Sequence, residues 1–353
     1  MGAPVRDPWR VADGVIVIRP PRLGDAARLV AGRDPEWARW MGPGSDHPAP
    51  TACIERDGVV VGWVDYETGH EWLAPDEVNL GYAVFPAHRR EGVATRAVML
   101  LVHRLALEGR YRTASVLIAP DNLGSLAVAT QARFRERERL ADGILLARPV
   151  PPLAYTDGVV TIRRQDPLDL DADLEAKDAE QIRWLWGPGE RERWEAMSPT
   201  EQRERAARGL RANRDAFGAG PKWSFAVDNE ASRCVAYVDC DLEHASAPRG
   251  EANIAYASHP AHRGRGYVSR AVRLLLRFLA EHTRARRAQL VIDHENLASL
   301  RVARALTQAE PETVVDDRGR LALRFRLDVD PFAQSPAEAR ASSKATARRT
   351  DSA

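Results

Sequence analysis

The sequence is short of three features that often define the chemistry of a protein: cysteine, lysine and long apolar runs. Its three cysteines, Cys53, Cys234 and Cys240, are an odd number without a Cys-x-x-Cys pair, which argues against a disulfide framework and a zinc site. No apolar run approaches the ~18 residues of a membrane span, and residues 1–14 lack the apolar segment of a secretory signal. These absences predict a cytoplasmic protein with no metal and no membrane partner.

An excess of charge of one sign is also missing. The 353 residues carry 51 basic and 50 acidic side chains, and the formal net charge is +1. Such a balance exerts no overall attraction on nucleic acid, so a nucleic-acid partner is not expected and any basic site must be local. Only Lys177, Lys222 and Lys344 are lysines, so nearly all of the positive charge is arginine, a bias typical of a GC-rich genome.

What the chain does contain is the same unit twice. Its length predicts about two domains of ordinary size. Residues 79–107 align with residues 253–281 without a gap, and 15 of the 29 positions are identical. The same offset of 174 residues places Asn122 on Asn296 and Ser125 on Ser299. The sequence therefore contains an internal duplication of a whole unit.

Each copy has a glycine loop between a predicted strand and a predicted helix. In the second copy, residues 253–258 alternate as a strand does, the loop covers residues 263–268, and an apolar helical stripe follows. The stripe consists of Val268, Ala271, Val272, Leu275 and Leu279. Glycines at such a turn let backbone N–H groups approach a ligand, and the helix N-terminus adds partial positive charge. The loop, with its arginines, therefore suits a phosphate or pyrophosphate.

Both loops resemble a known family. Arg-x-x-Gly-x-Ala at residues 89–94 and Arg-x-x-Gly-x-Val at residues 263–268 resemble the acetyl-CoA pyrophosphate loop of the GNAT acyltransferase superfamily, although Val268 stands where that family has Gly or Ala. The Asn-x-x-Ser runs that begin at Asn122 and Asn296 resemble a helix of its ribosomal-protein N-acetyltransferase-like branch. The resemblance implies two tandem α/β domains, each with a mixed, mostly antiparallel sheet and helices on both faces, and acetyl-CoA as co-substrate.

The resemblance also implies a set of cofactor-binding residues in each copy. In the second copy they are Arg263, Gly264, Arg265, Gly266, Tyr267, Val268 and Asn296. In the first copy they are Arg89, Arg90, Gly92, Val93, Ala94 and Asn122.

The two copies differ in length before the loop. We expect an N-terminal domain over 1–148, a proline-rich linker over 149–156, a C-terminal domain over 157–333 and a disordered tail over 334–353. About 29 residues between Glu190 and Lys222 have no counterpart in the first copy, and residues 199–217 within them read as a helix. Because the helices after the first strand wall the acceptor site in GNAT proteins, the first domain is predicted to be trimmed on its acceptor side.

The catalytic residues are less clearly marked. The resemblance implies Ser299 as the acid that protonates the leaving thiolate, with Ser125 in the same place in the first copy; Asn296 and Ser299 equally fit a helix cap. Where many relatives place a glutamate base, this chain has Asn79 and Asn253. Glu251 lies two residues earlier on the same strand face, about 7 Å away, a gap that one water spans.

Glu251 is therefore the preferred base, although a solvated charge at the strand end fits the same position. Other residues that remain candidates are Asp239, Glu243, His244, His259 and Glu295. Four tryptophans around the inserted helix form either an aromatic wall for a substrate or part of a core: Trp184, Trp186, Trp194 and Trp223.

The favoured function is acetyl transfer from acetyl-CoA to a primary amine of a small molecule, an antibiotic or a metabolite, with the second domain catalytic. A protein N-terminal amine is the alternative acceptor. A non-catalytic acyl-CoA sensor is the alternative from another class, and two independently active domains are a further one. Deprotonating a lysine-like amine at pH 7 costs about 4 to 5 kcal/mol against about 1 for an α-amine, so a site without a strong base favours amines of low pKa.

Overall fold

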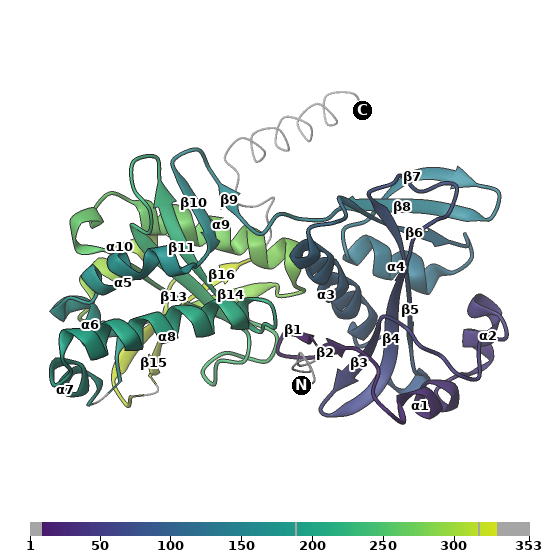
Figure 1. The fold of residues 1–353 in the computed structure, drawn as a ribbon, viewed down its shortest axis with the longest axis horizontal. Helices are drawn as coiled ribbons and strands as arrows, with labels where there is room; N and C mark the ends of the chain where they lie inside the picture. The colour runs from purple at the N-terminus through teal and green to yellow at the C-terminus, as the bar shows by residue number, and fades with distance from the viewer. Residues whose placement is uncertain (1–8, 188, 317, 330–353) are drawn as a thin grey trace, which may run out of the picture. The chain divides into compact units, whose positions relative to one another are not determined.

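The computed structural model describes residues 9–187, 189–316 and 318–329, which form two compact units (Figure 1). Unit 1 lies mainly within residues 9–153 and unit 2 mainly within residues 154–329. Each unit is built on an eight-stranded sheet with helices packed against it. The mixed α/β class and its repetition in two tandem domains are as predicted.

The described residues of unit 1 form eight strands, four helices and one 3-10 turn. The strands are β1 (Val11–Ala12), β2 (Val17–Arg19), β3 (Ala52–Arg56), β4 (Val59–Glu67), β5 (Glu77–Val84), β6 (Thr113–Ile118), β7 (Arg135–Leu140) and β8 (Gly143–Pro149). The helices are α1 (Asp25–Ala31), α2 (Pro35–Met41), α3 (Val93–Glu108) and α4 (Leu123–Gln131), and the 3-10 turn is η1 (Pro86–His88).

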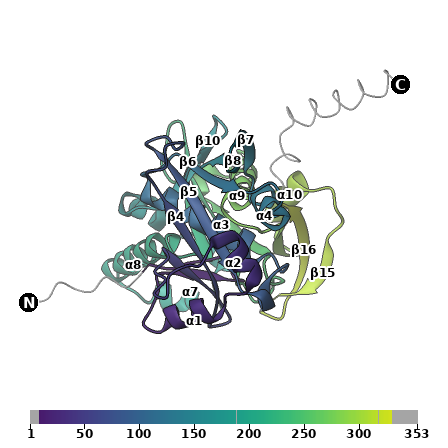
Figure 2. The ribbon, with the colours of Figure 1, turned by 90° about the vertical axis from the view of Figure 1, so that its right-hand side faces the viewer.

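The sheet of unit 1 has the order β1-β2-β3-β4-β5-β6-β8-β7, and only β5 and β6 are parallel. Its two faces bury different side chains because neighbouring residues of a strand point to opposite sides. On β4, Val60 packs with Leu29 of α1, whereas Val61 belongs to the core that includes α3. Helices therefore cover both faces, and α3 lies along the central strands (Figure 2).

Unit 2 repeats this plan with additional helices. Its strands are β9 (Tyr155–Thr156), β10 (Val160–Arg164), β11 (Lys222–Asn229), β12 (Ala236–Asp241), β13 (Ala252–Ser258), β14 (Arg287–Asp293), β15 (Glu312–Val315) and β16 (Leu321–Asp328). Its helices are α5 (Leu170–Glu175), α6 (Ala179–Leu185), α7 (Glu190–Glu195), α8 (Pro199–Phe217), α9 (Tyr267–His282) and α10 (Leu297–Leu306), with 3-10 turns η2 (Pro167–Asp169) and η3 (Pro260–His262).

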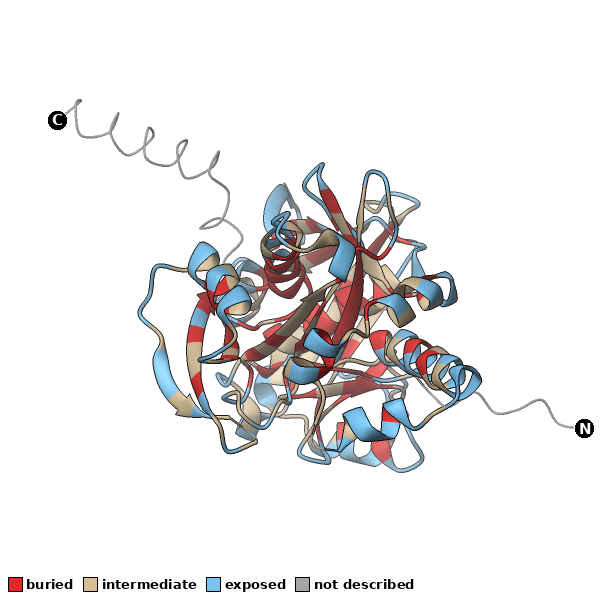
Figure 3. Cartoon of the chain, turned by 90° about the vertical axis from the view of Figure 1, so that its left-hand side faces the viewer, coloured by how far each residue is buried: buried red, intermediate tan, exposed pale blue. Residues whose placement is uncertain are grey.

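The sheet of unit 2 has the order β15-β16-β14-β13-β12-β11-β10-β9, and β13 and β14 are its parallel pair. Every residue of the predicted apolar stripe, from Val268 to Leu279, is buried in α9. Phe278 of α9 packs edge-on against Trp223 and Phe225 of β11, with ring centroids 5.6 and 4.9 Å apart. Buried residues are accordingly concentrated in the strands and the inner helix faces (Figure 3).

The helix expected over residues 199–217 is α8, and it is specific to unit 2. In unit 1, residues 42–51 connect α2 to β3 without a helix. α8 packs against α5 and β11 through Ala206, Leu210 and Phe217. In the part of the chain that the structure describes, no helix combines the length and apolarity needed to cross a membrane.

Candidate active site

The site begins where two parallel strands of unit 2 separate. The register of β13 and β14 pairs only Ala252 with Ala288 and Asn253 with Gln289. Beyond Asn253, β13 continues to Ser258 without a partner on the β14 side. Because each strand residue carries one backbone donor and one acceptor, the separation leaves backbone groups of β13 free to meet a ligand.

Two cavities open at this separation. The first, which we call the loop cavity, has a volume of about 490 Å³ and is lined by residues 263–268 and by parts of α6 and α10. The second, the carboxylate cavity, has a volume of about 370 Å³ and is lined by polar residues of β11, β12, β13 and β14. Trp184, Leu185, Tyr256, Asn296 and Ser299 line both. The two cavities therefore meet at these five residues.

The glycine loop suits a phosphate group in its backbone geometry. Gly264 and Gly266 have φ angles of 75° and 76°, in the left-handed region that favours glycine. A Cβ atom placed on either would meet no atom within 4 Å, so space is open beside the loop backbone. α9 begins at Tyr267, and the N–H groups of its first turn have no partner within the helix. The Nδ1 atom of His262, which also lines the cavity, is buried without a hydrogen-bond partner among the described residues.

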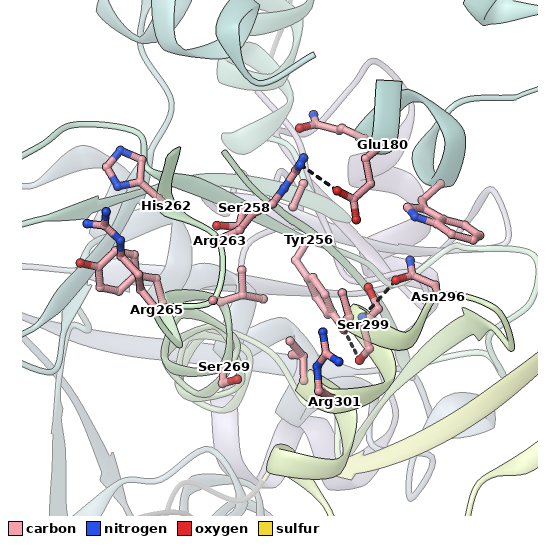
Figure 4. Close-up of a pocket in the computed structure, with 18 of the residues that line it drawn as sticks. Glu180, Tyr256, Ser258, His262, Arg263, Arg265, Ser269, Asn296, Ser299 and Arg301 are labelled. Atoms are coloured by element: carbon pink, nitrogen blue, oxygen red, sulfur yellow. Dashed lines mark hydrogen bonds and ion pairs between the residues drawn. The ribbon is translucent and has the colours of Figure 1, made fainter. Parts of the chain in front are cut away.

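The Arg263 side chain, which lines the loop cavity, is hydrogen-bonded to carboxylates of α6 and its N-cap. Its guanidinium donates two hydrogen bonds to Asp178, at 2.7 and 2.8 Å. It donates a third to Glu180 at 2.8 Å (Figure 4). Asp178 is the N-cap of α6, where it also accepts from the Gln181 N–H. Arg263 holds the pKa of Asp178 below its usual range, chiefly through this hydrogen bond. The arginine therefore ties α6 to the loop, and its guanidinium faces carboxylates.

The junction of the cavities is built by α10 and β13. Asn296 caps α10 and accepts from the Ser299 N–H at 3.1 Å, so the capping interpretation of the Asn-x-x-Ser run is correct in geometry. The Tyr256 hydroxyl donates to the Ser299 carbonyl at 3.2 Å (Figure 4). Burial raises the pKa of Tyr256. Sequence reasoning gave Tyr256 no role, although its identity with Tyr82 in the aligned repeat was visible.

The predicted site residues of unit 2 separate into two groups. All seven predicted cofactor residues, 263–268 and Asn296, line the loop cavity, and Ser299 lines both cavities. Glu251 is not among the described residues that line either cavity. Its carboxylate accepts from Arg326 at 3.5 Å. The base role of Glu251 remains a prediction, but the structure does not bring its side chain to the junction.

The carboxylate cavity contains two aspartates on one face of β12. Asp239 and Asp241 are two residues apart, so their side chains point to the same side of the sheet. Burial raises the pKa of Asp239 to about 6; Lys222 opposes this shift and Asp241 adds to it. On the opposite wall, Arg320 pairs with Asp293 at 3.0 Å and with Asp316 at 3.1 Å. Asp239 was one of the alternatives left open by the sequence.

The four tryptophans do not form a common wall. Only Trp184 lines the cavities. Trp223 is fully buried in the core, and Trp194 is buried with its ring edge-on to Trp186 at 5.2 Å. The inserted helix α8 contributes no residue to either cavity, so it does not wall them as expected.

Unit 1 repeats the scaffold of the site with different chemistry. Arg89 donates to Asp34, the N-cap of α2, as Arg263 does to Asp178. Asn122 caps α4 by accepting from the Ser125 N–H at 3.0 Å.

The remaining predicted residues of unit 1 lie around the start of α3. Gly92 is its N-cap with φ at 78°, and Val93 and Ala94 are its first residues. Arg90 stands where unit 2 has Gly264, with φ at 64°, and Glu91 stands where unit 2 has Arg265. Glu91 forms an ion pair with Arg56.

Comparisons with known proteins agree with this architecture. The family described as Acetyltransferase (GNAT) domain matches the chain twice, over residues 16–135 and 160–306. None of the curated proteins matches. Among solved structures, the chain is similar to Mycobacterium smegmatis RimJ in complex with CoA-disulfide, with 19% identity, a TM-score of 0.40, and coverage of 53% of this chain and 90% of that one.

Two other similar structures each align with 50% of this chain, and the alignment covers 98% of the other chain. One is the ribosomal L7/L12 alpha-N-protein acetyltransferase RimL in complex with coenzyme A, with 16% identity and a TM-score of 0.41. The other is AAC(6')-Ib in complex with paromomycin and acetyl-CoA, with 15% identity and a TM-score of 0.39.

Because the family matches span more than half of its length, the chain belongs to the GNAT acetyltransferase family. Its enzyme class is therefore that of the acetyl-CoA-dependent N-acetyltransferases. The family and the duplication expected from the sequence are confirmed.

Proposed function

We propose that unit 2 transfers the acetyl group of acetyl-CoA directly to a primary amine of a small molecule while both substrates are bound. The observation that carries this proposal is the meeting of two cavities at Tyr256, Asn296 and Ser299. Direct transfer requires the amine and the thioester to be held within reacting distance. Two cavities that share a wall suit this requirement, with one for each substrate.

The loop cavity is the side for acetyl-CoA. Backbone N–H groups of residues 264–268, at the start of α9, would hold the pyrophosphate, and Arg265 and Arg301 line the same cavity with positive charge. The unpaired backbone of β13 beyond Asn253 would hold the thioester and polarise its carbonyl. Ser299 lies at the junction and would donate the proton that the leaving thiolate takes.

The carboxylate cavity is the side for the amine. Its volume of about 370 Å³ is in the range of small-molecule sites, which supports a small acceptor over a peptide. Its aspartates favour a cationic ligand. An α-amine near pKa ~7.7 to 8.0 loses its proton at lower cost than a lysine-like amine of pKa ~10.4. Antibiotic-type or metabolite amines of low pKa are therefore our first candidates, and a protein N-terminus is the second.

Unit 1 is proposed to bind no acetyl-CoA. Its loop carries Glu91 where unit 2 has Arg265, and a carboxylate repels a pyrophosphate. The second residue of its loop is Arg90, at positive φ. The counterpart in unit 2 is Gly264, which has open space beside it.

Calorimetric titration of the full chain with acetyl-CoA tests which unit works. We expect one site per chain, loss of binding in Gly266→Glu, and unchanged binding in the matched control Gly92→Glu. Glutamate in the loop places bulk and negative charge where the pyrophosphate should lie. Two sites per chain, each lost separately, would mean that both units are functional.

Turnover is measured on the same protein with a panel of amines: an amino acid amide, a linear diamine, an aminosugar and a short peptide with a free N-terminus. Release of free thiol reports transfer. Binding of acetyl-CoA without turnover of any of these amines would favour the sensor alternative, and preference for the peptide would favour a protein acceptor. Absence of binding in the wild type would overturn the transferase proposal.

A further inference from the structure

We propose that Asp239, on strand β12 of unit 2, is the general base that accepts the proton of the acceptor amine. The inference rests on the proposed function of unit 2 and names the residue that performs its proton transfer. It replaces Glu251, the base favoured by sequence reasoning.

Asp239 is placed beside the junction by strand register. It pairs with Ala255 of β13, the residue that precedes Tyr256. Residues in register on antiparallel strands have Cα atoms about 4.5 to 5.5 Å apart and point to the same face. Asp239, Ala255 and the junction residue Tyr256 all line the carboxylate cavity. An amine bound in this cavity therefore shares it with the Asp239 carboxylate.

Asp65 is the residue of unit 1 that matches Asp239. It has the same position in its sheet but different hydrogen-bond partners. Asp65 of β4 pairs with Gly81 of β5, as Asp239 pairs with Ala255, at the common offset of 174 residues. The Asp65 carboxylate accepts from the Thr51 N–H at 3.0 Å and also from the Thr51 hydroxyl. Asp239 forms no ion pair within 4 Å with any residue that the structure describes. The Asp65 carboxylate is thus held by the Thr51 side chain, whereas Asp239 accepts from the backbone N–H of Ala255 and has no side-chain partner among the described residues.

The groups around Asp239 suit proton transfer near neutral pH. Lys222 of β11 and Tyr237 and Asp241 of β12 are its charged and titratable neighbours, and Asn253 lies on the same face of β13. Further along the cavity are His244 and the Arg320 cluster with Asp293 and Asp316.

Burial raises the pKa of Asp239 to about 6, so the carboxylate is ionised at pH 7 yet basic enough to take a proton. Glu251 lacks this placement because it precedes the first residue of β13 and contacts Arg326.

The proton balance of the reaction is simple. The acceptor enters as an ammonium ion, and one proton moves from its nitrogen to the Asp239 carboxylate. The nitrogen lone pair then forms the C–N bond to the acetyl carbonyl carbon while the C–S bond breaks. The nitrogen then loses a second proton. The leaving thiolate takes one proton from Ser299 or water, and these two transfers balance. The products are the N-acetyl amine, the free thiol of coenzyme A, and a proton that Asp239 releases to solvent.

The test compares Asp239→Asn with two matched variants, Asp65→Asn and Glu251→Gln, in the full chain. We expect Asp239→Asn to lower kcat by about 10²- to 10⁴-fold, the usual contribution of acid–base catalysis. Its Kd for acetyl-CoA should stay within about threefold of wild type, because Asp239 does not line the loop cavity. Asp65→Asn should keep kcat within about threefold, and Glu251→Gln should lower kcat by much less than Asp239→Asn does.

The pH profile separates a base from a residue that only supports the fold. Wild-type kcat should rise through about pH 6 and then level off, as Asp239 ionises. In Asp239→Asn, kcat should keep rising at higher pH, because only amine that is already neutral can react. A kcat of Asp239→Asn near wild type, or a loss confined to Glu251→Gln, would overturn this proposal and leave the transferase function intact. Failure of the wild type to turn over any amine would overturn both.

Discussion

The two glycine loops stand on nearly the same scaffold and carry different chemistry. Each follows a strand that separates from its parallel neighbour, begins a sixteen-residue helix, and has an arginine that clamps the N-cap aspartate of an earlier helix. In unit 2 the next residues are Gly264 and Arg265; in unit 1 they are Arg90 and Glu91.

The comparison teaches that the arginine of the loop motif has a structural task. Arg89 and Arg263 each form the same bidentate contact, with Asp34 and Asp178 respectively, although the two residues that follow each arginine differ. A match to the motif at this arginine therefore indicates how the loop folds. The two residues after it differ in charge: Gly264 and Arg265 in unit 2, and Arg90 and Glu91 in unit 1.

The largest effect should come from giving the unit 2 loop the charge of the unit 1 loop. Arg265→Glu removes a cation from the loop cavity and adds an anion. We expect acetyl-CoA affinity to fall by about thirtyfold or more, roughly 2 kcal/mol. Calorimetry measures the change. The reverse variant, Glu91→Arg, is the control; a new second site in it would mean that charge alone disables unit 1.

A second difference lies just before the loops, where unit 2 has His259 and unit 1 has Phe85. Burial lowers the pKa of His259 to about 4, with the charges of His262 and Lys177 adding to the shift. The unfolded state, with a pKa near ~6.5, binds the proton more readily, so stability is full above about pH 6.5 and falls as pH drops toward 4.

His259→Phe should remove this acid sensitivity. At pH 5 the wild type should have lost roughly 2 kcal/mol of unfolding free energy from this group, since one pKa unit is worth about 1.4 kcal/mol. Urea unfolding at pH 5 and pH 7 measures the difference. An equal loss of unfolding free energy from pH 7 to pH 5 in wild type and His259→Phe would show that His259 does not cause the acid sensitivity.

The Arg263–Asp178 and Arg89–Asp34 contacts should differ in their effect on activity. Arg263→Met frees α6, which supplies Trp184 and Leu185 to both cavities. We expect KM for both substrates to rise by about tenfold, or about 1.4 kcal/mol, because binding must then order the helix. Arg89→Met breaks the same contact in unit 1 and should leave steady-state kinetics unchanged. Equal kinetic losses in the two variants would show that unit 1 also contributes to the site.

The smallest effect concerns backbone strain at the second loop position. Arg90 adopts φ of 64°, which costs a residue with a Cβ about 1 kcal/mol. Arg90→Gly should therefore raise the unfolding free energy of unit 1 by about that amount, and Gly264→Arg should lower that of unit 2 similarly. Denaturant unfolding followed by tryptophan fluorescence reports both. A destabilised Arg90→Gly would mean that the arginine side chain makes compensating contacts.

Much of the fold could be predicted because its signals are local and occur twice. The stripe from Val268 to Leu279 follows from helical period alone, and α8 was placed over residues 199–217 from its own sequence. The acceptor side was predicted less well. α8 was expected to wall that site, yet it packs on α5 and β11, where its apolar residues Ala206, Leu210 and Phe217 are buried.

The sequence by itself determined the family, the duplication, and the loop residues that meet in one cavity, because neighbours along the chain remain neighbours in a turn. Only the tertiary structure decided which carboxylates line a cavity that meets the junction. Glu251 is close to Asn253 in sequence but contacts Arg326, which lies 75 residues away. Asp239 reaches the cavity through the register of β12 with β13. Strand register and long-range ion pairs depend on the packed sheet, and no local pattern encodes them.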